Sequence, residues 1–294
     1  MHPSPTTPRE RHVLVRGAQL FVREIGGGPP VFVLHGGPDF DHGYLLPALD
    51  VLADRCRLVY YDQRGRGRSA PGVRAEDVTL DSELADLDAL REHLGLDRIA
   101  VLGHSFGALL ALEYALRHPQ RVSHVIVMNA APVSSAEVVA MRELWLRDWP
   151  EDRAAMDAIA ATPEFESGDI GTEARYYRLH YGPTVPAHHM DDLLKRMRAH
   201  FTPETVRAAR AIEDRLMDAT WRRPDYDLAP ALARLDVPAL VLHGERDFVP
   251  VASAERIANA LPRGRLALVP GTGHFSYLER PADVARRVTE FVRA

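Results

Sequence analysis

The sequence predicts an α/β protein with a mostly parallel central sheet, flanking helices and a helical cap inserted after the sixth strand. Three observations predict this fold class. Unbroken apolar runs of about five residues recur along the chain, as is typical of strands buried on both faces. Helical patterns separate these runs, and strand–helix alternation implies right-handed crossovers in an open sheet. The alternation then stops for roughly a hundred residues, too many for an ordinary connection.

The strands and helices of the sheet region follow in chain order. Alternating residues at 12–17 and 19–24 predict two strands that pair as a hairpin at the sheet edge. Apolar runs predict six further strands, at 30–36, 57–62, 98–104, 124–130, 238–244 and 265–271. Helical patterns predict helices at 40–54, 79–94, 105–117, 252–261 and 281–293.

The long segment between the sixth and seventh strands is mainly helical. All three tryptophans, Trp145, Trp149 and Trp221, lie within it or at its edge. We interpret the segment as a cap over the strand ends, which divides the chain into the first part of a core (1–133), the cap (134–234) and the second part of the core (235–294). The helical patterns of the cap are 136–149, 151–161, 172–181, 190–201 and 203–221.

Composition excludes several classes of protein. Of the 294 residues, 46% are hydrophobic and 26% charged, which is ordinary for a globular protein. No apolar run reaches the roughly 18 residues of a membrane span, so we expect no membrane partner. A net charge of −5 without a long basic block argues against nucleic acid as a partner. The first twelve residues have no apolar signal region, and we expect a loose tail on a cytoplasmic protein.

Neither a metal nor an organic cofactor is expected. The single cysteine, Cys56, excludes an internal disulfide and a cysteine-based metal cluster, and its apolar surroundings indicate a strand residue rather than a nucleophile. Lys195 is the only lysine, so a Schiff base would depend on it, yet its helical pattern predicts a solvated face. His188 and His189 are adjacent, but without a third ligand nearby two histidines do not make a metal site.

The stretch GHSFG, residues 103–107, is the strongest chemical signal. It joins a buried strand directly to a helix, so Ser105 occupies a very tight turn. Gly103 and Gly107 remove side chains where the strand and the helix crowd each other. A turn of this kind exposes the hydroxyl above the sheet, and the helix N-terminus favours developing negative charge. The pattern therefore predicts that Ser105 is a nucleophile rather than an incidental serine.

A serine nucleophile needs a base and an acid that orients the base. His274 lies in a glycine-containing loop after the last strand and is our candidate base. Asp247, in the loop after the preceding strand, is our candidate acid, and Glu245 is its rival. His35, His104 and His243 also border strands, but each lies within a motif that explains it otherwise.

Negative charge on a reacting carbonyl oxygen needs two backbone N–H groups directed at it. We expect one from Phe106, immediately after the nucleophile, and the other from Gly37 in the HGGPD loop (residues 35–39). Glycines in this loop let the backbone approach a substrate closely, and Pro38 fixes a turn.

Five motifs together resemble a known family. HGGPD, DQRGRGRS (62–69), GHSFGA, HGERD and GTGH occur in the order and approximate spacing of the α/β-hydrolase fold superfamily. The combination of HGGP with DQRG-x-G-x-S is similar to the proline iminopeptidase branch. The resemblance covers about residues 12–132 and 235–293. It implies that Ser105, Asp247 and His274 form a catalytic triad, in the chain order typical of that fold.

Three features depart from the iminopeptidase pattern. The family's HGGPG ends here in Asp39, which is also a candidate N-cap for helix 40–54. The nucleophile motif lacks the tryptophan of GGSWG. The cap lacks the glutamate-containing stretch that holds a substrate's amino group; Glu213, Asp214 and Asp218 could replace that glutamate, but a solvated helix face is the favoured interpretation.

These observations favour a serine hydrolase that cleaves an ester, lactone or amide of a small to medium, partly apolar substrate through an acyl-enzyme. A proline iminopeptidase-type aminopeptidase is the alternative, C–C bond hydrolysis stays open, and a non-catalytic ligand-binding protein is a third hypothesis. We expect a small molecule or short peptide as partner, and a homo-oligomer is left open. Arg64, Arg66 and Arg68 could indicate an anionic substrate, but ties to neighbouring carboxylates and carbonyls are the favoured interpretation.

Overall fold

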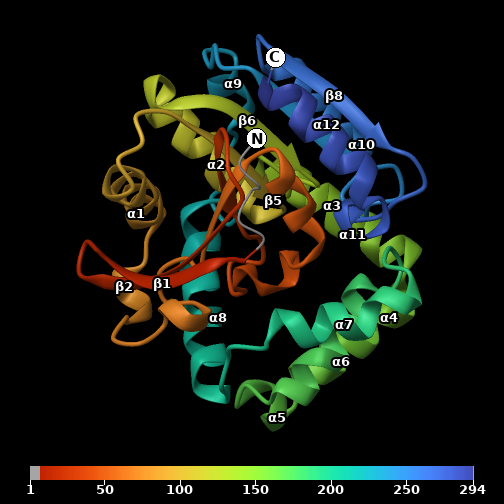
Figure 1. Cartoon of the computed structure of the whole chain (residues 1–294). Helices are drawn as coiled ribbons and strands as arrows, with labels where there is room; N and C mark the ends of the chain where they lie inside the picture. Colours follow the sequence, from red (N-terminus) through yellow and green to blue (C-terminus); the bar gives the residue numbers. More distant parts are fainter. Residues whose placement is uncertain (1–6, 294) are drawn as a thin grey trace.

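The computed structural model describes residues 7–293, in which eight strands form one sheet in the order β1-β2-β4-β3-β5-β6-β7-β8 (Figure 1). Strand β2 runs antiparallel to both of its neighbours. All the remaining neighbouring pairs, from β4 to β8, are parallel. The predicted edge hairpin and parallel core are therefore confirmed. The strands are β1 (Arg9–Val15), β2 (Ala18–Ile25), β3 (Pro30–Leu34), β4 (Arg57–Tyr61), β5 (Ile99–His104), β6 (Val122–Met128), β7 (Ala239–Gly244) and β8 (Gly264–Val269).

The N-terminal expectation needs one correction. The predicted loose tail extended to residue 12, but β1 begins at Arg9 and pairs along its length with β2. Backbone hydrogen bonding to β2 thus orders residues that composition alone suggested were loose. Residues 1–6 of the predicted tail lie outside the described part of the chain.

The sheet separates two apolar clusters, because successive strand side chains point to opposite faces. Along β3, Phe32 and Leu34 face one cluster, whereas Val31 and Val33 face the other. The first cluster includes residues of α1 (Leu80–His93), α2 (Phe106–Arg117), α9 (Ala229–Leu232) and α10 (Val251–Ala260). The second includes residues of the 3₁₀ helix η2 (Ala48–Asp54), α11 (Ser276–Glu279) and α12 (Pro281–Arg293). Both faces are thus covered, as continuous apolar strands require.

The predicted helix 40–54 is wrong in form. The structure has two 3₁₀ helices there, η1 (His42–Leu45) and η2, separated by Leu46 and Pro47. Pro47 has no N–H to continue the first helix, and Leu46 before it is extended. Cys56 lies in the second apolar cluster, where burial raises the pKa of its thiol, as expected of an inert residue.

Seven helices occupy the segment between β6 and β7, six of them ahead of the short α9 already described. Figure 1 shows α4 to α7 gathered to one side of the sheet, and α8 returning beneath the core. Ile212 and Leu216 of α8 join the first apolar cluster, and Leu193 of α7 joins the second. A short β-bridge between Ser134 and Asp227 brings the two ends of the segment together. The six helices ahead of α9 are α3 (Ser135–Asp148), α4 (Pro150–Ala160), α5 (Pro163–Glu166), α6 (Ile170–Tyr181), α7 (Ala187–Met197) and α8 (Pro203–Ala219).

The parallel strands place their carboxyl ends at one edge of the sheet, where loops after β3, β5, β6, β7 and β8 converge. The candidate residues all lie in these loops. Between residues 7 and 293, no helix has both the length and the apolar character needed to cross a membrane. The remaining short 3₁₀ helices are η3 (Gly67–Ser69), η4 (Ala75–Asp77) and η5 (Pro119–Arg121).

Candidate active site

Ser105 lies at the sharp turn between β5 and α2. Its φ of 55° and ψ of −121° form a strained conformation that costs a non-glycine residue about 1–3 kcal/mol. The flanking glycines permit it: a side-chain carbon on Gly103 would lie 2.1 Å from the Gly107 carbonyl oxygen, and one on Gly107 would lie 2.3 Å from the Leu34 carbonyl oxygen. The predicted crowding at both glycines is therefore confirmed. Ser105 itself is partly accessible although the strand before it is buried.

His274 and Asp247, from the loops after β8 and β7, are in direct contact. The Nδ1 atom of His274 lies 2.9 and 3.0 Å from the two carboxylate oxygens of Asp247. Both side chains are almost fully buried, with 2% and 0% exposure. Burial would raise the pKa of Asp247, but the charge of His274 and the donors around the carboxylate outweigh burial and lower the pKa to about 2. An ionised Asp247 holds Nδ1 protonated, which leaves Nε2 as the basic nitrogen.

Asn129, directly after β6, is a site residue that the sequence analysis did not identify. Its side-chain N–H groups donate to Asp247 Oδ2 at 2.9 Å and to the Gly273 carbonyl at 3.0 Å. Its Oδ1 accepts a hydrogen bond from the Ser276 hydroxyl at 2.6 Å. Asn129 also has a positive φ of 45°, which asparagine tolerates better than most residues. The sequence signal that could have identified Asn129 is its position: it is a polar residue directly after a buried strand, at the sheet edge where the other candidate residues lie.

The structure separates the acid and its rival. Glu245 is exposed, and its carboxylate accepts a hydrogen bond from the Gly271 N–H at 3.0 Å. It therefore stabilises the loop before His274, whereas Asp247 contacts the imidazole. The geometry favours Asp247 for the role of acid.

The other strand-end histidines have structural partners. His35 Nε2 accepts from the Gln63 N–H at 3.1 Å, and His243 Nε2 lies 2.9 Å from the Val249 carbonyl oxygen. Burial, helped by nearby positive charge, lowers the pKa of His35 to about 3. His35 is therefore neutral, and since its Nδ1 also lies 3.1 Å from the Gly36 carbonyl oxygen, both of its ring nitrogens are in use, which makes it a poor alternative to His274.

A hydrogen-bonded chain connects the HGGPD loop to the loop that carries His274. The Gly36 N–H donates to the Tyr44 hydroxyl at 2.7 Å, and this hydroxyl lies 2.8 Å from His104 Nδ1. His104 Nε2 lies 2.9 Å from the His274 carbonyl oxygen. Burial, with the adjacent His274, lowers the pKa of His104 to about 3, so its neutral ring can accept at Nδ1 and donate at Nε2. Both loops are thus anchored on the residue that precedes Ser105.

The HGGPD loop lies directly against the turn that carries Ser105. A side-chain carbon at Gly36 would lie 2.7 Å from Cβ of Ser105, so the close approach requires glycine. Gly37 has a positive φ of 49°. Phe106 is the first residue of α2, where an N–H has no intrahelical acceptor. Because the Gly36 N–H already donates to Tyr44, the Gly37 and Phe106 N–H groups stay the candidates for the oxyanion hole.

Asp39 has a different role from the predicted helix cap. The N-cap of η1 is Asp41, whose carboxylate accepts from the Gly43 N–H at 2.7 Å. The Asp39 carboxylate instead accepts hydrogen bonds from the Arg198 guanidinium and, at 3.1 Å, from the Tyr177 hydroxyl. The family's glycine position is thus occupied here by an acid that binds two residues from between β6 and β7.

Aromatic side chains surround His274. The Tyr181 ring lies parallel to the imidazole, with 6.2 Å between centroids and an 11° interplanar angle, and the Phe248 ring centroid is 4.4 Å away. His180 packs on Phe248 at 5.1 Å and stacks on Trp145 at 5.5 Å. Burial, with the nearby charge of His274, lowers the pKa of His180 to about 3. The surroundings of the imidazole are therefore aromatic and largely uncharged.

The three acidic residues of α8 face different surroundings. Asp214 and Asp218 are exposed and pair with Arg222, as a solvated helix face predicts. Glu213 does not follow that interpretation: it is half-buried, and burial, reinforced by the negative charge of Asp39, raises its pKa well above the ordinary value. Glu213 is therefore turned away from the solvated face of α8, where the charge of Asp39 still acts on it.

The three arginines of DQRGRGRS bind carboxylates of the chain itself, which confirms the structural interpretation over an anion site. Two of the pairs connect this motif to α1 and the third closes the motif on itself. They are Arg64–Asp86 at 2.6 Å, Arg66–Glu83 at 2.7 Å and Arg68–Asp62 at 2.9 Å.

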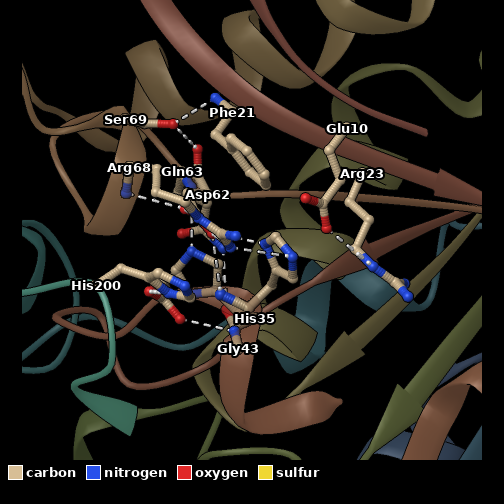
Figure 2. A network of polar contacts seen from close by, with 12 residues as sticks. Glu10, Phe21, Arg23, His35, Gly43, Asp62, Gln63, Arg68, Ser69 and His200 are labelled. Carbon is tan, nitrogen blue, oxygen red and sulfur yellow. Dashed lines mark hydrogen bonds and ion pairs between the residues drawn. The ribbon is translucent and has the colours of Figure 1, made fainter. Parts of the chain in front are cut away.

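Figure 2 shows the polar network centred on Asp62, between the HGGPD loop and β2. The Ser69 hydroxyl donates to the Asp62 carbonyl at 2.7 Å and accepts from the Phe21 N–H at 2.8 Å. Burial would raise the pKa of Asp62, but His42 and Arg68 outweigh burial and hold the pKa well below its usual range. The network thus fixes the DQRGRGRS segment next to the HGGPD loop. Gln63 of this segment donates to His35 through its backbone N–H and its side-chain amide, as Figure 2 shows.

His188 and His189, the adjacent histidines at which the sequence analysis expected no metal site, lie in α7. In the part of the chain that the structure describes, no three histidine, cysteine, aspartate or glutamate side chains are grouped so that they could hold a metal ion. The two adjacent rings lie 4.1 Å apart, centroid to centroid.

Comparison with known proteins adds independent information. Residues 29–281 match the family model described as alpha/beta hydrolase fold. A proline iminopeptidase of Levilactobacillus brevis is 28% identical over 306 residues, which cover 97% of each chain. A proline iminopeptidase of Xanthomonas citri is 29% identical over 305 residues and 92% of each chain.

Solved structures agree with this result. The crystal structure of a proline iminopeptidase from Mycobacterium smegmatis has a TM-score of 0.72 and 25% identity, covering 97% of this chain and 98% of that one. A thermophilic esterase from Thermogutta terrifontis has a TM-score of 0.71 over the same shares of the two chains, and its 22% identity supports the fold alone.

Proposed function

The chain belongs to the α/β hydrolase fold family, and we propose that it hydrolyses an ester, lactone or amide through an acyl-enzyme on Ser105. The observation that carries the proposal is the buried contact between His274 Nδ1 and the Asp247 carboxylate, at 2.9 and 3.0 Å, in a loop tied to the residue before Ser105. Such a pair orients an imidazole so that it can take the proton of a serine hydroxyl.

The proposed reaction has two steps on the same residues. Nε2 of His274 accepts the Ser105 proton as Oγ attacks the substrate carbonyl, and the imidazolium then gives that proton to the leaving alcohol or amine. Water, deprotonated by His274, cleaves the resulting acyl ester and restores the serine. Asp247 stays ionised throughout, because its pKa of about 2 lies far below neutral pH.

The tetrahedral intermediates require stabilisation of a negative oxygen. We propose that the N–H groups of Gly37 and Phe106 provide it, since both lie in segments that meet at Ser105. Removal of one such donor typically costs about 2.7–4 kcal/mol of transition-state stabilisation.

The substrate is proposed to bind between these loops and a cap formed by residues 134–234. Tyr181, His180 and Phe248 offer flat, uncharged surfaces beside His274, which suit a partly apolar acyl or leaving group. A small molecule or a short peptide end fits this chemistry.

Labelling with a fluorophosphonate tests the proposal. We expect one equivalent of probe on Ser105, hydrolysis of p-nitrophenyl butyrate by the native protein, and loss of both in a folded Ser105→Ala variant. Esterase activity that persists in Ser105→Ala, or folded native protein that takes up no probe, would refute the acyl-enzyme.

Glu213 favours a second candidate function, an aminopeptidase that releases N-terminal residues. A half-buried acid whose pKa is raised by burial and by Asp39 gains from a substrate ammonium group nearby. Several curated relatives are named proline iminopeptidases. Proline β-naphthylamide assayed beside p-nitrophenyl butyrate distinguishes the two: an aminopeptidase prefers the first, and Glu213→Gln raises KM for the amine substrate alone.

A further inference from the structure

The HGGPD loop ends in a turn that is held from outside the loop. The Phe40 N–H donates to the Gly37 carbonyl at 2.8 Å, which closes the turn over Pro38 and Asp39. Asp39 is 1% exposed although its side chain is an acid. A buried carboxylate in a turn that carries a candidate oxyanion donor needs a partner, and that partner fixes the turn.

The partner is Arg198, which follows α7. One guanidinium nitrogen, Nη1, donates to the Asp39 carbonyl oxygen at 2.6 Å, and the other, Nη2, donates to the Asp39 carboxylate. Nε donates to Glu173 Oε2 at 2.7 Å, and Arg198 is itself only 4% exposed. All three sides of the fork are therefore engaged, so the guanidinium has little freedom to move.

Aromatic rings hold the guanidinium in place. Its carbon lies 4.9 Å from the Phe40 ring centroid and 5.0 Å from that of Phe201. The Tyr177 hydroxyl binds the same Asp39 oxygen at 3.1 Å. The turn after Gly37 is thus held by a side chain and by a hydroxyl that both come from the segment between β6 and β7.

The bond to the Asp39 main chain distinguishes this contact from a stabilising ion pair. A buried ion pair is by itself weak support for stability, because its attraction must offset the desolvation of both charges. A donor on the carbonyl of Asp39, however, sets the orientation of a peptide two residues from Gly37. Displacement of an oxyanion donor affects the transition state, where charge develops, far more than the bound substrate.

We propose that Arg198 is a positioning residue: it holds the Gly37–Phe40 turn through Asp39 and thereby sets the Gly37 N–H for the oxyanion. The inference rests on the proposed function. It also assigns a purpose to the departure from HGGPG, since a glycine at position 39 would offer the carbonyl but no carboxylate. Formation of the oxyanion hole then depends on the segment between β6 and β7 being in place.

The test compares Arg198→Lys with a matched control, Arg256→Lys. Lysine keeps the charge but cannot reach the carbonyl, the carboxylate and Glu173 together. Arg256 also ties the inserted segment to the core, through Glu137 and Asp227 at 2.6 Å each, but does not touch the HGGPD loop. With p-nitrophenyl butyrate we expect kcat of Arg198→Lys to fall about 10-fold or more with KM nearly unchanged, and Arg256→Lys to stay within about two-fold of native.

A transition-state probe supplies the second readout. Affinity for phenylboronic acid, which forms a tetrahedral adduct on the serine, should fall by the same factor as kcat/KM, an effect that simple loss of stability does not produce. Asp39→Ala is the second variant; it leaves Arg198 paired with Glu173 and should also lower kcat, less strongly.

The outcomes separate cleanly. A folded Arg198→Lys with native kcat and native boronate affinity overturns the inference, as does an equal loss in Arg256→Lys. If Arg198→Lys does not fold, native kcat in folded Asp39→Ala has the same meaning. Failure of the proposed function is a different result: native protein without hydrolysis, or activity that survives Ser105→Ala.

Discussion

Replacing Asp247 with asparagine changes one atom of the proposed triad and tests its logic directly. The carboxylate accepts from His274 Nδ1, from Asn129 Nδ2 at 2.9 Å and from the Val249 N–H at 3.0 Å. Asparagine has one accepting oxygen and one donating amide NH2 group in place of the two carboxylate oxygens. Because donors surround both positions, the NH2 group must face at least one other donor, with which it cannot form a hydrogen bond.

A rotation of the Asn129 amide, which would present an acceptor to the new NH2 group, does not remove this conflict. The amide of Asn129 is fixed by donation to the Gly273 carbonyl and by acceptance from the Ser276 hydroxyl. With its oxygen toward the Val249 N–H, the new side chain directs its amino group at Asn129 or His274. His274 then adopts the tautomer with Nε2 protonated, which cannot accept the Ser105 proton. Loss of the correct tautomer lowers kcat by about 10⁴ in a triad of this type.

The assay is kcat for p-nitrophenyl butyrate, with Glu245→Gln as the matched control on the same loop. Glu245 is exposed, and its carboxylate accepts from the Gly271 N–H while Asp247 contacts His274, so its variant should keep nearly native kcat. A fall of less than about 10-fold in folded Asp247→Asn, or an equal fall in Glu245→Gln, would refute the assignment of the acid.

The same variant changes stability with a pH dependence of known sign. The pKa of Asp247 falls from 3.8 to about 2 on folding, so its ionised form contributes stability above about pH 4 that is lost as pH falls toward 2. The depression corresponds to about 2 kcal/mol. Urea unfolding should therefore show native protein more stable than Asp247→Asn by roughly this amount at pH 7, with the difference narrowing from pH 4 to 2.

Two further substitutions test the scaffold of the site. Gly107→Ala would place a methyl group 2.3 Å from the Leu34 carbonyl and should destabilise the fold by about 1–3 kcal/mol in urea unfolding; a loss below about 0.5 kcal/mol would show that the strand and helix can separate. Tyr44→Phe leaves the Gly36 N–H and His104 Nδ1 without their hydroxyl partner, which should cost about 1–3 kcal/mol and lower kcat. Native stability and native kcat in Tyr44→Phe would contradict the link between the two loops.

Much of the fold could be predicted because its signals are local. Buried parallel strands carry unbroken apolar runs, such as residues 30–34 and 239–242, so each is visible in a window of a few residues. The GHSFG turn is also local, since the crowding at Gly103 arises from Gly107 only four residues away. These predictions needed no knowledge of what packs across the chain.

The partners of Asp39 could not be predicted because they are far away in sequence. Arg198 lies 159 residues from Asp39, and Asn129 lies 118 residues from Asp247. A local window offers only nearby roles, and it therefore suggested an N-cap for Asp39. The predicted helix 40–54 is wrong for a local reason instead, the break that Pro47 makes between the two 3₁₀ helices.

Glu213 combines a feature that local sequence predicts with one that depends on distant parts of the chain. The apolar stripe of α8 contains Ala209, Ile212 and Leu216, and position 213 is four residues after the first and three before the last. Helix geometry places it on the inward side, beside that stripe, while Asp214 is rotated by about 100° toward solvent. The spacing thus predicts that Glu213 turns inward, whereas the effect of the Asp39 charge on it depends on how α8 packs in the tertiary structure. Amphipathic spacing predicts which acid turns inward; only tertiary packing determines what that acid meets.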